Sequence, residues 1–234
     1  LIRVKTDVLD LAIDPNGGDI VQLTLPQYPR RQDRPDVPFQ LFDNGSERTY
    51  LAQSGLIGAN APDSSAGRAL WTSAQKSYQL ADGQNTLVVD LTYSKDSVNY
   101  IKRFTFKRGL NPECSAKEQE LKKPGCVDPA SYQVDVRYLI DNQSAQAWAG
   151  NMYAQLKRDN SDDPSKTAAT STATYLGAAM ATHDSAYKKV SMKDIDKAPA
   201  KETVKGGWVA WLQHYFVTAW IPSQDTENAV QTRK

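Results

Sequence analysis

Two histidines are the residues of this 234-residue chain most able to carry acid–base or metal chemistry. His183 is followed by Asp184, but neighbouring residues on a strand point to opposite faces, so this pair is more typical of a surface than of a catalytic dyad. His214 stands among aromatic residues, where a hydrogen-bonded side chain at the edge of a core is the simpler interpretation. Neither histidine has the H-E-x-x-H spacing of a zinc site. The histidines therefore indicate no metal centre.

Two cysteines, Cys114 and Cys126, stand close together in an otherwise cysteine-free chain. The charged segment between them separates two strand-like runs, and in an oxidising compartment such a pair predicts a disulfide. Closing a loop of this size would stabilise the fold by about 3 kcal/mol in the chain-entropy model. A zinc site would need two more ligands, and no histidine is near in sequence. Two unpaired surface thiols are the alternative.

Other catalytic patterns lack the context that their chemistry requires. Gly17-Gly18 lies in a turn with no following helix to hold a phosphate, and Gly206-Gly207 is not followed by Lys-Ser/Thr. The chain has no G-x-S-x-G nucleophile elbow. Asp7, Asp10 and Asp14 are most simply charges on a solvent face and a turn former. The residues therefore predict neither an enzyme nor a bound cofactor.

Tryptophan is the most suggestive residue type. Trp208, Trp211 and Trp220 fall within thirteen positions. Aromatic side chains along a groove can bind sugars or extended apolar peptides, whereas in a strand-rich domain they more often form core. We take Trp208, Trp211 and Tyr215 as the candidate groove or partner surface, with core packing as the alternative.

The elements that must position these residues are mostly strands. Apolar residues alternate from Val4 to Ile13, a turn follows over 14–19, and a second strand over 20–25 ends at Pro26, which predicts a hairpin. A loop rich in Pro and Arg is expected over 27–38. Later strand-like runs lie at residues 39–42, 49–56, 77–80, 86–93, 98–107 and 132–140. Many short strands at close spacing indicate a β-sandwich or barrel.

The last third of the chain is less regular. Residues 157–173 are small and polar, which predicts a mobile loop and not a domain boundary. Residues 206–222 are rich in aromatic and β-branched residues, which favours strand, although the first half also allows a short helical turn. The polar tail over 223–234 is expected to fray.

Composition limits the partners. Net charge is +1, so the chain lacks the basic surface of a nucleic-acid-binding protein. No apolar run approaches the ~20 residues that cross a bilayer. The first residues lack the ~7–15-residue apolar core of a signal peptide, so we expect the sequence to begin inside a longer protein.

A series of blocks agrees, in order, with one known family. The most specific runs from Lys205-Gly206-Gly207-Trp208 through Ile221-Pro222. The other blocks lie at residues 4–11, 17–20, 25–29, 38–42, 52–56, 81–85, 106–109, 177–179 and 187–189. Together they resemble the large periplasmic domain of Gram-negative YidC membrane protein insertases.

The resemblance implies a galactose-mutarotase-like β-sandwich (a supersandwich) with few short helices over residues 1–222. It implies a non-enzymatic accessory domain at the periplasmic side of the bacterial inner membrane, tethered there by parts of the protein outside this sequence. The implied partners are Sec translocon components and nascent inner-membrane proteins, which the whole protein inserts and folds with or without the translocon. The resemblance implies no cofactor and no nucleic acid.

Two departures from the family pattern shape the remaining expectations. The cysteine-bearing segment over 111–128 is not part of the pattern, and the chain stops soon after residue 222, where further strands are expected. We therefore expect a C-terminally truncated domain with an unpaired strand edge unless a partner covers it. Because the sandwich type is shared with carbohydrate-active proteins, a carbohydrate-binding or aldose-epimerase-like domain is the alternative, although fold alone does not carry function.

Overall fold

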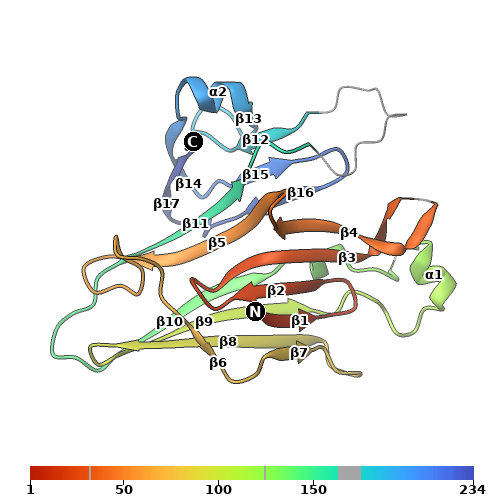
Figure 1. The fold of residues 1–234 in the computed structure, drawn as a ribbon, viewed down its shortest axis with the longest axis horizontal. Coiled ribbons are helices and arrows are strands. Elements are labelled where there is room, and N and C mark those ends of the chain that lie inside the picture. The colour runs from red at the N-terminus through yellow and green to blue at the C-terminus, as the bar shows by residue number, and fades with distance from the viewer. Residues whose placement is uncertain (32, 124, 163–174) are drawn as a thin grey trace. The chain divides into compact units, whose positions relative to one another are not determined.

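The computed structural model describes residues 1–31, 33–123, 125–162 and 175–234, and it consists mainly of strands (Figure 1). Its contacts divide the chain into two compact units, the N-terminal unit Leu1–Lys157 and the C-terminal unit Arg158–Lys234. This division falls at the start of the 157–173 segment, for which the sequence predicted a loop and no boundary. Most of that predicted loop, residues 163–173, lies outside the described residues.

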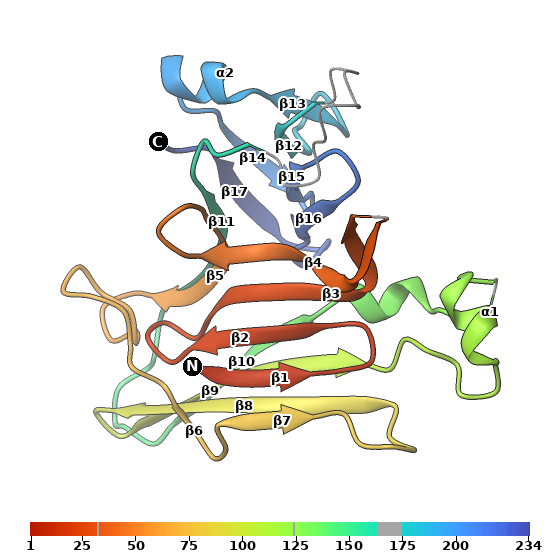
Figure 2. The ribbon, with the colours of Figure 1, turned by 45° about the vertical axis from the view of Figure 1, so that its right-hand side comes forward.

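The N-terminal unit contains two sheets (Figure 2). The first has seven strands in the order β11-β5-β4-β3-β2-β1-β7, and the second has four in the order β10-β9-β8-β6. The elements are β1 (Ile2–Lys5), β2 (Asp10–Asp14), β3 (Asp19–Arg31), β4 (Arg34–Asn44), β5 (Thr49–Ile57), β6 (Thr72–Ser73), β7 (Ser77–Gln79), β8 (Thr86–Lys95), β9 (Val98–Lys107), α1 (Ala116–Glu120), the 3-10 helix η1 (Pro129–Tyr132), β10 (Asp135–Asn142) and β11 (Asn151–Arg158).

The core of the N-terminal unit lies between these two sheets. Every second side chain of β9 is buried, which is the pattern of a strand with one face on a core; the buried residues are Val98, Tyr100, Lys102, Phe104 and Phe106. The sheets meet through polar contacts as well, because the hydroxyls of Tyr138 on β10 and Ser54 on β5 lie 3.1 Å apart. This arrangement is a β-sandwich, as the strand pattern predicted.

The opening strand of the sequence is two strands in the structure. The alternation from Val4 to Ile13 is interrupted by a turn, in which the Thr6 hydroxyl accepts hydrogen bonds from the amides of Val8 and Leu9 at 3.2 and 2.9 Å. Such side-chain bonds offer the backbone an alternative to a strand ladder. β1 and β2 therefore pair with each other as a hairpin, and β2 pairs in turn with β3. The prediction of one continuous first strand was wrong for this reason.

Pro26 does not end β3. The strand continues to Arg31, and most of the predicted 27–38 loop is a long hairpin formed with β4. The register shifts three times along this hairpin, between Leu23 and Arg31, so the prolines occupy irregular positions where a missing amide donor is tolerated. Composition alone could not show this, because Pro and Arg are typical of loops.

The C-terminal unit has a four-stranded sheet in the order β13-β12-β15-β16 and a separate pair, β14-β17. Its elements are β12 (Gly177–Met180), β13 (Lys188–Val190), α2 (Met192–Lys197), β14 (Lys201–Lys205), β15 (Val209–Leu212), β16 (Val217–Trp220) and β17 (Glu227–Gln231). The aromatic block thus forms strands, without the helical turn that its spacing also allowed. β17 lies inside the predicted polar tail, where it pairs with β14 along all five residues.

The mainly β, antiparallel class with few short helices is confirmed. Within the part of the chain that the structure describes, no helix is long and apolar enough to span a membrane.

Candidate functional site

The three aromatic residues of the candidate surface have different environments in the C-terminal unit. Trp211 on β15 is buried, with 7% of its surface exposed. Trp208, just before β15, is half-buried, and its ring lies 5.9 Å from that of Tyr187. Tyr215, in the turn between β15 and β16, is 64% exposed and meets the ring of His214 edge-on. Trp211 therefore serves the interior, while Tyr215 faces solvent.

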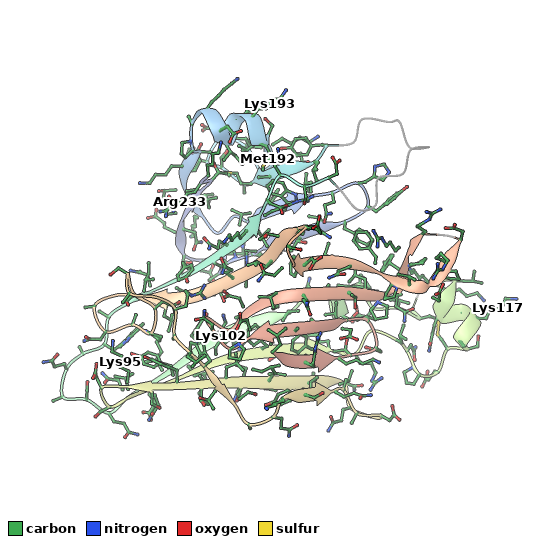
Figure 3. The ribbon with its side chains drawn as sticks, viewed as in Figure 1. Lys95, Lys102, Lys117, Met192, Lys193 and Arg233 are labelled. Atoms are coloured by element: carbon green, nitrogen blue, oxygen red, sulfur yellow. A yellow bond between two sulfur atoms is a disulfide. The ribbon has the colours of Figure 1, made fainter. Side chains whose placement is uncertain are left out.

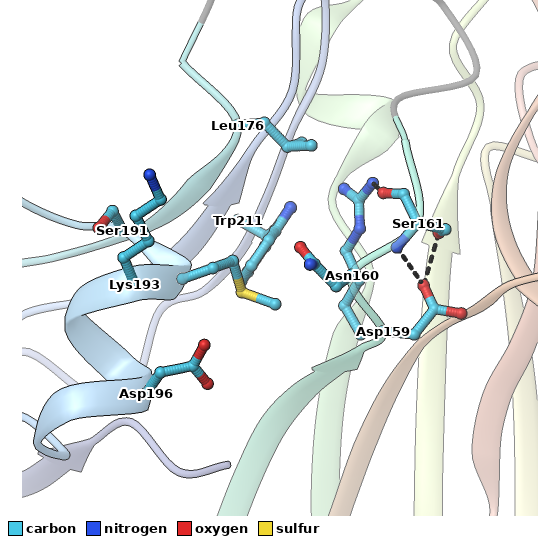
Figure 4. Close-up of a pocket in the computed structure, with 10 residues that line it drawn as sticks. Asp159, Asn160, Ser161, Leu176, Ser191, Lys193, Asp196 and Trp211 are labelled. Carbon is cyan, nitrogen blue, oxygen red and sulfur yellow. Dashed lines mark hydrogen bonds between the residues drawn. The ribbon is translucent and has the colours of Figure 1, made fainter.

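A pocket of about 300 Å³ lies beside Trp211 (Figure 4). Helix α2 and residues 159–161 lie on opposite sides of it, with Trp211 between them. The guanidinium of Arg158 stacks over the Trp211 ring at 5.3 Å and donates to the Ser161 carbonyl at 3.0 Å. The indole nitrogen of Trp211 is buried and has no hydrogen-bond partner among the described residues. The Ser161 hydroxyl, by contrast, donates a hydrogen bond to the Asp159 carboxylate.

An apolar stripe runs along the outside of the β15–β16 hairpin. Side chains at odd-numbered positions from 215 to 221 are all exposed. Val217 and Ala219 share a face of β16, while Tyr215 lies in the turn before the strand and Ile221 directly after it. The large members are Tyr215, Val217 and Ile221, whose exposed fractions are 64, 60 and 66%. β16 is also an edge strand of its sheet. We call Tyr215, Val217 and Ile221 the apolar stripe; exposed apolar groups of this kind are typical of protein contact surfaces.

In the contacts that the structure shows, the two histidines do not lie together and do not form an active site. The His183 Nδ1 lies 2.9 Å from the Asp184 carboxylate, and this partner raises the pKa of His183, but both side chains are almost fully exposed. His214 contacts the ring of Tyr215. An acid–base pair works best in a cleft that excludes water, and the His183 pair is on open surface.

An ionic cluster in the N-terminal unit was missed by the sequence analysis; it includes Lys102, which is labelled in Figure 3. Arg68 donates to both oxygens of Asp19 at 2.9 and 3.0 Å and to Asp63 at 3.2 Å. The ammonium of Lys102 lies 4.0 Å from Asp19 and donates to the carbonyls of Gly17 and Ser54 at 3.0 and 2.9 Å. Two basic side chains therefore face two acidic ones inside the sandwich.

Three members of the cluster are almost completely buried. The side chain of Lys102 is 1% exposed, and those of Asp19 and Asp63 are each 5% exposed. Burial lowers the pKa of Lys102 from its usual 10.5 to about 7, against the opposing attraction of Asp19. Burial also raises the pKa of Tyr138, whose hydroxyl lies at the edge of the cluster. Arg68 is the most exposed member, at 22%. The pairing of Lys102 on β9 with Asp19 on β3 joins the two sheets.

One signal could have revealed part of this cluster. In the alternating pattern of β9, Lys102 falls on the buried face between Tyr100 and Phe104, where a charged residue needs a buried partner. The partners Asp19, Asp63 and Arg68 could not be found in this way, because Asp19 begins β3 while Asp63 and Arg68 lie between β5 and β6, and only the tertiary fold brings them together.

The predicted disulfide is present. Cys114 and Cys126 are joined, with their Cα atoms 5.7 Å apart. The loop they close carries α1, whose first turn has a capping box between Ser115 and Glu118. Lys122, just after α1, holds its ammonium 3.2 Å from the ring centre of Tyr28 on the β3–β4 hairpin. The cysteines are therefore structural, and the loop is packed on the sandwich.

Comparison with known proteins decides the family. The family model described as YidC periplasmic domain matches residues 1–110 and 114–234. This chain belongs to the YidC periplasmic domain family. Proteins named membrane protein insertase YidC are 80% identical to it in Ectopseudomonas mendocina (strain ymp), over 234 residues, and 67% identical in Pseudomonas fluorescens (strain Pf0-1), over 235 residues. All of this chain is covered in both matches, against 40 and 38% of the relatives' lengths.

The match to the YidC periplasmic domain corrects one expectation. The sequence analysis treated residues 111–128 as lying outside the family pattern, but the family model leaves out only residues 111–113 and resumes at Cys114. The chain spans about two fifths of the length of the YidC relatives it matches. The apolar stripe lies in the block that resembled the family most specifically, and so does Trp211, whereas the rest of the pocket beside Trp211 is lined by residues 158–161, 176, 191–193 and 196.

Proposed function

We propose that this chain is the periplasmic accessory domain of a membrane protein insertase, held at the periplasmic side of the bacterial inner membrane, and that it acts by contacting other proteins. The family match supports the location and the association with an insertase. The apolar stripe is the observation that supports the mode of action, because three large apolar side chains lie exposed in one hairpin whose second strand is a sheet edge.

The stripe suits partners that expose apolar segments. Nascent inner-membrane proteins carry such segments, and an edge strand also offers backbone groups for pairing with an extended chain. Components of the Sec translocon are the second class of partner, since an insertase domain beside the channel would meet them. Under this proposal the Trp211 side chain supports the hairpin from inside, and Tyr215 makes contacts outside.

Complementation of a cell depleted of its insertase tests the proposal. The full-length protein would carry serine at Tyr215, Val217 and Ile221, and the matched control would carry Val88→Ser, which removes an exposed apolar residue of β8. We expect the triple variant to support slower growth than the control at equal protein levels. Equal growth of the two would contradict a functional role for the stripe.

Two deletions locate the contribution more coarsely. One lacks the segment equivalent to residues 1–205, and the other also lacks residues 206–222. Growth with the first and failure with the second would place the contribution in the hairpin block. Growth with both would contradict a required contact anywhere in the domain.

The alternative activity, an aldose epimerase, can be tested directly. Such an enzyme needs a carboxylate and a histidine that converge in one cleft, whereas His183 and Asp184 pair on open surface. We expect the purified chain to leave the rate of glucose mutarotation at the level of buffer. Clear acceleration that is lost on substitution of a histidine would overturn the proposal that the domain acts by contact alone.

A further inference from the structure

Strand β10 of the N-terminal unit has one open side. It pairs with β9 without a register shift from Asp135 to Asn142 and is the last strand of its sheet. Among the described residues, no backbone hydrogen bond joins its other side to another strand. The strand also contains no proline, glycine or bulge, which are common protections of an edge. β10 is therefore able to accept another strand along its full length.

The solvent face of β10 carries a self-complementary pattern. Arg137 and Asp141, of opposite charge, stand two residues before and two residues after Leu139, and all three side chains share the outward face. Leu139 is 40% exposed. The side chain of Arg137 is 72% exposed and forms an ion pair with Asp135. A two-fold axis through Leu139 would place each Arg137 opposite the Asp141 of a second copy, twice, with the two leucines between them.

The pattern selects this register over its neighbours. An axis through Tyr138 would bring Asp135 opposite Asp141 at two places, and an axis through Ile140 would place Leu139 opposite Asp141. Directly opposite like charges destabilise an antiparallel pair, and opposite charges stabilise it. In the favoured register Tyr138 also lies opposite Ile140 on the inner face. The outer face then pairs opposite charges, and the inner face pairs large apolar side chains.

We propose that two copies of this chain associate through antiparallel pairing of their β10 strands about Leu139. The four-stranded sheets of the two copies then join into one continuous sheet of twice that size, and each copy presents the same strand to the other, as a two-fold interface requires. Since the paired charges are exposed, the association is weak and depends on concentration. It is independent of the apolar stripe and of the function proposed above.

Disulfide trapping tests the geometry. Opposite residues in an antiparallel pair have Cα atoms about 4.5–5.5 Å apart, within the range that a disulfide spans. In a Leu139→Cys variant the new thiol is the only free one among the described residues, because Cys114 and Cys126 are joined. Val88→Cys is the matched control, since Val88 is similarly exposed, at 44%, and lies on β8, which pairs with β9 along its length and with β6 only at Leu91 and Thr92. It therefore reports how fast an exposed thiol on another strand forms dimers.

Under mild oxidation we expect the Leu139→Cys chain to form a covalent dimer at least about ten times faster than the Val88→Cys chain, at a rate that rises with protein concentration. Equal rates for the two variants would overturn the proposal. So would trapping of Leu139→Cys only to some other protein when it is produced in cells.

Charge exchange provides a second test that does not depend on oxidation. Arg137→Asp and Asp141→Arg each replace two attractive pairs with two repulsive ones, and we expect each to weaken dimerisation in sedimentation velocity by about tenfold. The double variant restores the complementary pairs, so its dissociation constant is expected to return to near that of the original chain. A chain that stays monomeric at all accessible concentrations, or a double variant no better than the singles, would overturn the proposal.

Discussion

The buried position of Lys102 predicts an unusual dependence of stability on pH. Its ammonium lies inside the sandwich with Asp19 and Arg68, and burial lowers its pKa to about 7 from the usual 10.5. In the unfolded chain the same group keeps its proton until about pH 10.5. Between these values the unfolded state binds more protons than the folded state, so the free energy of unfolding rises with pH. Below pH 7 both states are protonated, and this contribution no longer changes.

The size of the effect follows from the two pKa values. For a shift from 10.5 to about 7, the linkage relation gives a gain of about 2 kcal/mol between pH 7 and pH 9. The Lys102→Met variant lacks the titrating group and should lose this gain. In this variant the carbonyls of Gly17 and Ser54 lose the Lys102 donor but keep a hydrogen bond from Arg68, which donates to both. The loss of the pH-dependent gain is therefore expected without collapse of the cluster.

Urea denaturation followed by far-ultraviolet circular dichroism at pH 7, 8 and 9 measures this gain. The control is Lys95→Met, an exposed lysine at the end of β8 (Figure 3). We expect the control to keep the rise with pH that the original chain shows. If the N-terminal and C-terminal units unfold in separate transitions, the effect belongs to the transition that Lys102→Met shifts. Identical pH dependence in all three proteins would refute the assignment of a neutralised lysine.

Three further substitutions test packing, and each is measured as a change in the free energy of unfolding. Gly17→Ala places a Cβ 2.6 Å from the Arg68 guanidinium, which is held by Asp19 and Asp63, and should cost at least about 2 kcal/mol. Gly83→Ala, also at positive φ but in open space, should cost only about 1 kcal/mol, and equal costs would contradict the close approach. Replacing Cys114 and Cys126 by alanine should cost about 3 kcal/mol and remove any effect of reductant, which continued sensitivity would contradict. Trp211→Ala should cost about 3–5 kcal/mol and Trp211→Phe less, because phenylalanine keeps part of the buried ring and the indole nitrogen has no partner among the described residues; equal losses for the two variants would contradict this.

The sequence predicted the regular strands well. The alternation over 98–107 corresponds to β9, and the run at 86–93 lies within β8, because one face of each strand is buried on a single core. Local chemistry also sufficed for the disulfide, since both cysteines belong to one short loop. These features depend on neighbours in sequence or on strand parity.

Features that depend on distant partners could not be predicted in the same way. The Thr6 turn divides an alternating run through side-chain bonds that the apolar pattern does not show. The β3–β4 hairpin passes through Pro26 because its ladder shifts register around it. The ionic cluster needs a lysine from β9 and an arginine from a loop, and no local pattern links them. For the candidate surface, the sequence identified the aromatic block but not which member is buried: Trp211 packs inside, and Tyr215 is exposed.

Site-specific photo-crosslinking from the apolar stripe tests the central proposal most directly. A photoreactive amino acid would replace Val217 in the full-length insertase in living cells, with Val88 as the matched exposed position in the N-terminal unit. We predict that position 217 crosslinks nascent inner-membrane proteins or Sec translocon components well above position 88. Equal or absent crosslinking at the two positions, in a protein that is made and active, would contradict the account of this domain as a protein-contact module.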